Sequence, residues 1–167
     1  MIKKILVGLL IVLIIIQFIR PEKNISATLS ENDITTKYDV PEDVKIILSK
    51  ACNDCHSNNT NYPWYANFQP VAWYLADHIN DGKRHLDFSE FAAYEPWKAH
   101  HKLEEVAEEV EENKMPLEDY ARIHEESALT ESEKNTLISW SKDLRAQMEA
   151  DSTIDLTRPP RPEGNKH

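Results

Sequence analysis

The chain has 167 residues and a formal net charge of −10 at pH 7, with 29 acidic residues against 19 Lys and Arg. This acidity argues against nucleic acid as a partner, because binding phosphates requires a basic surface, and it favours a partner protein with a basic patch. The length suits one small domain, the scarcity of glycine and 29% charged residues favour helices over a β-sandwich, and two cysteines cannot build a disulfide framework.

The N-terminal segment has the pattern of an export signal. Lys3 and Lys4 precede an apolar run over residues 5–19, which is typical of a secretory signal or an uncleaved signal anchor. The basic residues keep that end in the cytoplasm and send the rest across the membrane. No strong cleavage site follows, so we interpret residues 1–20 as an anchor in the bacterial cytoplasmic membrane, with the domain in the periplasm. A cleaved signal and a soluble periplasmic protein are the alternative.

Helical patterns fill most of the remaining chain. Residues 21–38 are polar and are interpreted as a tether. An apolar stripe at helical spacing then predicts a helix from about Pro41 that runs into Cys52. The loop over residues 57–70 leads to a helix from Val71 to about Asn80, which we expect to end near Gly82.

The C-terminal half shows two longer helical segments. Ser89 could cap a short segment, and residues 97–112 are helical by composition, before Pro116 breaks the pattern. A capping box of Thr130 and Glu133 opens the last helix. The pattern predicts an all-α domain over residues 39–150 and an extended tail over 151–167.

Cys52-Asn53-Asp54-Cys55-His56 forms the motif C-x-x-C-H. Two cysteines three positions apart at a helix end can reach the two vinyl groups of one haem, and the adjacent His56 can then ligate the iron. The motif predicts one covalent haem c. A redox dithiol, half of a zinc site and a structural disulfide are the alternatives.

A second axial ligand of the iron is expected from the other side of the haem. Met115 lies in Lys-Met-Pro, after a helix and before a loop, where a thioether could be held over the opposite haem face. His78 is the alternative, because its helix lies beside the loop over residues 57–70, here called the aromatic loop for Tyr62, Trp64, Tyr65 and Phe68. Trp64 and Trp73 are chosen as lining residues of the haem pocket.

Three segments carry a more specific signature. They are C-N-D-C-H-S-N-N-T-N-Y-P-W-Y, then Q-P-V-A-W-Y-L-A-D-H-I-N-D-G-K-R-H-L-D-F-S-E-F, then K-M-P-L-E-D-Y-A-R-I-H. Together they resemble the bacterial haem-binding domain family of cytochrome c-like proteins over about residues 40–148. The resemblance implies a small cytochrome c-like helical domain around one covalent haem. It also implies haem attachment at Cys52 and Cys55, and iron ligation by His56 and Met115.

Three functions fit these features. One-electron transfer on the periplasmic side of the membrane requires a closed, six-coordinate iron. A haem-based sensor or a small peroxidase requires a labile sixth ligand, and a haem-bearing subunit of a membrane complex is the third possibility. No Ser-His-Asp pattern occurs, so an electron carrier is favoured over a catalyst.

Overall fold

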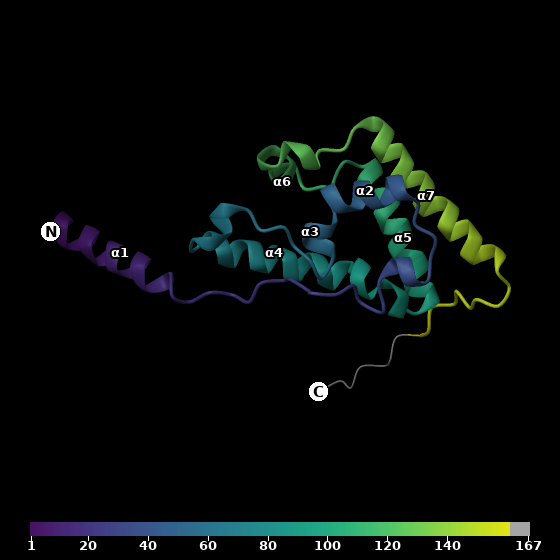
Figure 1. The fold of residues 1–167 in the computed structure, drawn as a ribbon, viewed down its shortest axis with the longest axis horizontal. Coiled ribbons are helices and arrows are strands. Elements are labelled where there is room, and N and C mark those ends of the chain that lie inside the picture. Colours follow the sequence, from purple (N-terminus) through teal and green to yellow (C-terminus); the bar gives the residue numbers. More distant parts are fainter. Residues whose placement is uncertain (161–167) are drawn as a thin grey trace.

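The computed structural model describes residues 1–160, which fold into helices joined by loops (Figure 1). The long helices are α1 (Ile2–Ile16), α2 (Glu42–Ala51), α4 (Val71–His85), α5 (Pro96–Glu111) and α7 (Glu131–Ala150). Shorter ones are α3 (Asn53–His56), α6 (Glu118–Ile123) and the 3-10 helices η1 (Ile34–Thr36), η2 (Trp64–Asn67), η3 (Phe88–Ala93) and η4 (Glu125–Ser127). Over residues 1–160 the chain has no β-strand, only an isolated bridge between Ile25 and Asn59. The all-α prediction is therefore confirmed for this part of the chain.

The helix ends follow local chemistry. The capping box of α7 forms as predicted, because the Thr130 side chain accepts from the backbone N–H of Glu133 and the Glu133 carboxylate accepts from the N–H of Thr130. Asp87, not Ser89, caps η3: its carboxylate accepts from the N–H of Ser89 at 2.9 Å. α6 was not expected from the sequence.

Two further expectations need revision. α4 does not end near Gly82 but continues to His85, so the glycine lies inside the helix. The segment expected as a tether contacts the domain, because Ile34 is buried in the core and Asn32 donates to the Glu90 carboxylate at 3.0 Å. Residues 161–167 of the expected tail lie outside the described residues.

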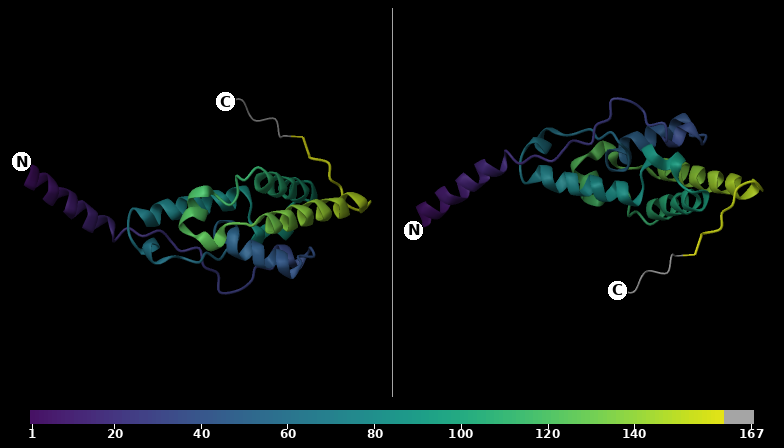
Figure 2. Two further views of the ribbon diagram at one scale, coloured as in Figure 1. Left: turned by 90° about the horizontal axis from the view of Figure 1, so that it is seen from above. Right: turned by 90° about the horizontal axis from the view of Figure 1, so that it is seen from below.

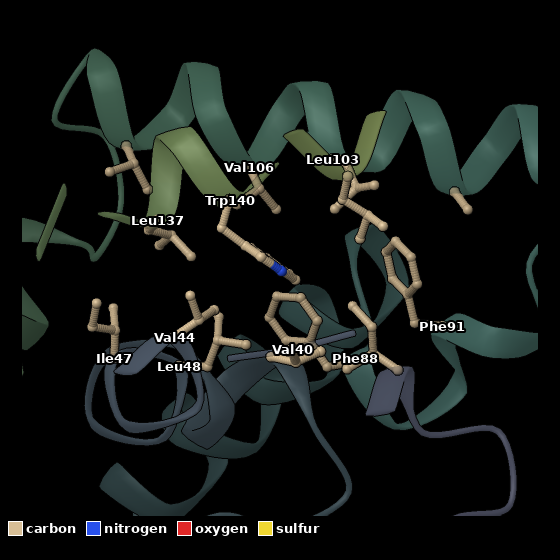
Figure 3. Close-up of a cluster of buried hydrophobic side chains, with 14 of the residues drawn as sticks. Val40, Val44, Ile47, Leu48, Phe88, Phe91, Leu103, Val106, Leu137 and Trp140 are labelled. Carbon is tan, nitrogen blue, oxygen red and sulfur yellow. The ribbon is translucent and has the colours of Figure 1, made fainter. Parts of the chain in front are cut away.

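The hydrophobic core lies between α2, α5, α7 and η3 (Figure 3). Val44, Ile47 and Leu48 of α2 face Leu137 and Trp140 of α7. The predicted packing of the first domain helix against the last is therefore confirmed, and α5 covers a second side of α7. Each fully buried aliphatic or aromatic side chain contributes roughly 1.5–3 kcal/mol. This core holds α2 rigidly, and α2 leads directly into the C-x-x-C-H motif.

Helix α1 projects from one end of the molecule (Figures 1 and 2). None of its residues is buried. Among residues 1–160, no helix combines the length and the hydropathy that crossing a membrane requires.

Candidate functional site

The C-x-x-C-H motif forms a single helical turn, α3, set off from α2 by a break at Cys52. The backbone N–H groups of Cys55 and His56 both donate to the carbonyl oxygen of Cys52, at 3.1 and 3.0 Å. The cysteines are half-buried and are not bonded to each other. Burial raises the pKa of Cys52 to about 12 and that of Cys55 to about 11. Both groups are therefore protonated thiols at neutral pH, unlike the low-pKa thiolates of redox dithiols.

The ring of His56 is fixed by two backbone carbonyl groups of α4 and its end. Nδ1 lies 2.9 Å from the carbonyl oxygen of Leu86 and 3.1 Å from that of Gly82. Carbonyl oxygens only accept, so Nδ1 carries the proton and Nε2 keeps its lone pair. Burial also lowers the pKa of His56, which favours the neutral ring. A neutral, oriented imidazole is the form that ligates a metal.

Gly82 sets the distance between the motif and α4. A Cβ at this position would lie 2.7 Å from the carbonyl oxygen of Cys55 and 3.1 Å from its Cβ. Both neighbouring atoms belong to a short, packed turn and cannot move away easily. Only glycine therefore allows α4 to approach α3 closely enough for His56 to reach the Gly82 carbonyl.

A cavity of about 450 Å³ opens beside Cys55. This volume falls in the range of small-molecule and cofactor sites, about 300–1,000 Å³. Its walls come from the motif, the loop after it, one face of α4 and helix α6, and are largely aromatic and aliphatic. The residues are Asp54, Cys55, Thr60, Asn61, Tyr62, Pro63, Tyr65, Val71, Tyr74, Leu75, His78, Ile79, Leu117, Glu118, Asp119, Tyr120, Ile123 and His124.

Three hydrogen bonds join side chains and backbone of residues that line this cavity. The Tyr120 hydroxyl donates to the Asp54 carboxylate at 2.7 Å, and that carboxylate also accepts from the N–H of Asn61. The Tyr65 hydroxyl lies 2.6 Å from Nε2 of His124. Burial, followed by the bond to Asp54, raises the pKa of Tyr120. These contacts tie α6 and the aromatic loop to the motif.

The residues fit a haem. The cavity is apolar enough for a flat porphyrin, one cysteine of the motif lies on its wall, and the next residue, His56, keeps the lone pair of its Nε2. Within residues 1–160, no group of three or more His, Cys, Asp or Glu side chains is placed to hold a metal ion directly. The zinc alternative therefore lacks a second half in this part of the chain.

The family model of a haem-binding domain matches residues 11–143. The chain belongs to this haem-binding domain family. The match begins earlier than the expected resemblance, and it includes residues 11–16 of α1 and the segment that follows. No curated protein and no solved structure is significantly similar to the chain.

The two candidates for a second axial ligand of this haem-binding domain lie in different settings. His78 is on the cavity wall, with Nδ1 2.9 Å from the carbonyl oxygen of Tyr74. Met115 is half-buried in the turn between α5 and α6, and its N–H donates to the carbonyl oxygen of Glu109. Its side chain is outside the set that lines the cavity, two residues before Leu117, which is inside it.

The structure separates the other predicted site residues. Cys55 lines the cavity, whereas Cys52 packs partly against the core and His56 is outside the lining set. Trp64 and Trp73, expected as lining residues, are outside the lining set and are 76% and 37% exposed. Their neighbours Tyr65 and Tyr74 line the cavity instead.

Asp54, Leu117 and Tyr120, which line the cavity, were not predicted from the sequence as site residues. The segment Lys-Met-Pro-Leu-Glu-Asp-Tyr contains two of these residues. Its aromatic and aliphatic residues, three apart in sequence, indicate that they share a helix face and could have pointed to this wall.

Proposed function

We propose that the chain binds one haem c covalently through Cys52 and Cys55, with His56 as an axial ligand, and carries single electrons on the periplasmic side of the bacterial cytoplasmic membrane. The observation that supports this most is the orientation of His56. Its Nδ1 is committed to backbone carbonyl groups, which leaves Nε2 free next to a cysteine on the wall of an apolar cavity.

The attachment step needs only the two cysteines and two vinyl groups. Each thiol adds across one vinyl double bond, so that a C–S bond and a C–H bond form and no electron is gained or lost. Burial keeps the thiols protonated before attachment. When bound, the haem would supply an iron that alternates between the ferrous and ferric states.

Met115 is our proposed sixth ligand. A thioether favours the reduced iron and suits an electron carrier, and the turn that holds Met115 leads directly to Leu117 on the cavity wall. His78 is the competing ligand because it already lies on that wall. Like His56, it contacts a backbone carbonyl oxygen through Nδ1, which leaves Nε2 able to bind a metal, so the preference for Met115 rests on the suitability of a thioether for an electron carrier.

A second function has one observation in its favour. Met115 is not among the residues that line the cavity, so a sixth position that opens readily is compatible with this arrangement. A haem sensor or a small peroxidase would need such a position.

Visible spectra of the haem-loaded protein distinguish these functions. We expect low-spin ferric and ferrous spectra, a weak methionine-to-iron band in the ferric state, and no reaction with carbon monoxide. Rapid carbon monoxide binding to the ferrous protein would instead support the sensor or peroxidase.

The proposed membrane location rests on the N-terminal segment, and the proposed redox partner rests on the negative charge of the domain. The apolar residues of α1 would hold the protein at the membrane, and the acidic domain would attract a redox partner with a basic patch. Docking of this kind should weaken as salt increases.

A further inference from the structure

Large aromatic side chains gather on the outside of the domain where α1 joins it. Phe18, Trp64, Phe68 and Trp73, here called the aromatic edge, are 82%, 76%, 55% and 37% exposed. Trp64 and Phe68 pack edge to face, with ring centroids 6.1 Å apart. None of the four belongs to the hydrophobic core or to the lining of the cavity. Exposed aromatic residues gathered in this way mark an interaction surface.

The end of α1 is attached to this edge by hydrogen bonds. The N–H of Gln69 donates to the side-chain oxygen of Gln17 at 2.9 Å. The Gln69 side chain and the indole N–H of Trp73 both donate to the carbonyl oxygen of Ile19, at 2.8 and 2.9 Å. The family match, which begins at residue 11, includes both sides of this contact. α1 and the aromatic edge therefore form one structural unit.

Basic residues lie at the same junction. Arg20 follows α1 directly, and Lys23 lies 3.4 Å from the Asn67 side chain and over the ring of Tyr62. Of the three basic residues in 1–20, only Arg20 lies at this junction, because Lys3 and Lys4 lie at the other end of α1. The chain after residue 20 carries a formal charge of −13. Positive charge beside aromatic side chains in an otherwise acidic protein fits the surface of a membrane that contains anionic lipids.

We propose that the aromatic edge rests in the headgroup region of the bilayer that holds α1. This inference uses the proposed function only in taking α1 as the membrane segment. Trp and Phe can bury their rings among lipid headgroups and upper acyl chains, while Arg20 and Lys23 contact lipid phosphates. Tyr65 and Val71, which adjoin Trp64 and begin α4, line the haem cavity. The cavity would therefore open close to the membrane surface.

Photolabelling of the full, haem-loaded chain tests this placement. The protein is reconstituted into vesicles of phosphatidylcholine and phosphatidylglycerol that include a phospholipid with a diazirine near its headgroup, and adducts are mapped by mass spectrometry. We expect labelling of Trp64 and Phe68 several-fold above that of Ile46, an apolar residue on α2 that is 58% exposed. This control has similar exposure but lies away from the junction.

Labelling of α1 separates the claim that α1 is the membrane segment from the claim that the aromatic edge lies in the headgroup region. If α1 is labelled and Trp64 and Phe68 match Ile46, the anchor stands and the placement of the edge is wrong. If neither α1 nor the edge is labelled, both are wrong, and if the edge is labelled without α1, only the anchor fails. Cross-links between the edges of two copies, without lipid adducts there, would overturn the inference in favour of self-association.

A charge variant provides a second test. Arg20→Gln with Lys23→Gln should lower labelling of Trp64 and Phe68 in vesicles with phosphatidylglycerol, and should have a smaller effect in vesicles of phosphatidylcholine alone. Equal labelling of this variant and the native chain in the anionic vesicles would remove the role given to the basic residues.

Discussion

Nδ1 of His56 lies 2.9 Å from the carbonyl oxygen of Leu86, the residue that directly follows α4. This contact joins the C-x-x-C-H motif to a helix that begins 15 residues later in the chain, and it fixes the tautomer of the ring. The orientation of the proposed axial ligand therefore depends on backbone atoms, which no side-chain pattern specifies.

His56→Ala should remove the axial imidazole without preventing haem attachment to the cysteines. We expect a high-spin ferric spectrum, because the iron loses a strong-field ligand. Imidazole added to the buffer should restore a low-spin spectrum. His101→Ala is the control, since this exposed histidine pairs with Glu104 and Glu105 of its own helix. A low-spin spectrum for His56→Ala without added imidazole would exclude His56 as the ligand.

Gly82→Ala should destabilise the junction of α3 and α4. The added methyl group would meet the Cys55 carbonyl oxygen at 2.7 Å, and forcing extra atoms into a packed site costs about 1–3 kcal/mol. Urea titrations followed by circular dichroism measure this loss, and haem spectra should show a disturbed His56. Gly8→Ala is the control, because nothing lies within 4 Å of the added atom. If both variants match the native protein, the close approach at Gly82 is not required.

Met115→Ala should lower the reduction potential and open the ferrous iron to carbon monoxide, because the thioether stabilises the reduced state. Met115→His should keep a low-spin spectrum at a lower potential. Potentiometric titration followed by visible spectra measures both changes. His78→Ala serves as the comparison and should leave the spectrum unchanged. If Met115→Ala leaves the spectrum and the potential unchanged and His78→Ala changes both, the sixth ligand is His78.

Glu133 should make the stability of the folded protein depend on pH. Its carboxylate lies 2.6 Å from the Lys50 ammonium group and also accepts from the N–H of Thr130, which together lower its pKa to about 2. A depressed folded-state pKa stabilises the fold above the unfolded-state value, and this contribution is lost as the pH falls towards 2. The difference in Tm between the native protein and Glu133→Gln should be constant above about pH 5 and should shrink below it. A pH-independent difference would show that the contacts are neutral hydrogen bonds.

Much of the helical framework could be predicted because its signals are local. The stripe of Val44, Ile47 and Leu48 and the capping box at Thr130 each act within one or two helical turns. Gly82 was misinterpreted because a glycine that ends a helix and one that allows close packing are identical in sequence. Only the position of Cys55 against it reveals the second role.

The cysteines and His56 stand out in sequence because the chemistry of the motif requires their spacing. The cavity walls do not, because Tyr65, Tyr74 and Tyr120 meet through tertiary packing. Trp64 and Trp73 were chosen for their size, but each side chain points outwards from an element whose next residue, Tyr65 or Tyr74, lines the cavity. A choice between adjacent aromatic residues depends on helix rotation, which residue type does not determine.

The intact mass of the native chain under denaturing conditions tests covalent haem attachment most directly. After expression in cells that attach haem c, we expect the polypeptide mass increased by that of one haem, and the bare polypeptide mass for Cys52→Ala with Cys55→Ala. A native chain that loses its haem on denaturation, or a double variant that keeps it, would contradict the assignment of Cys52 and Cys55 as the attachment sites.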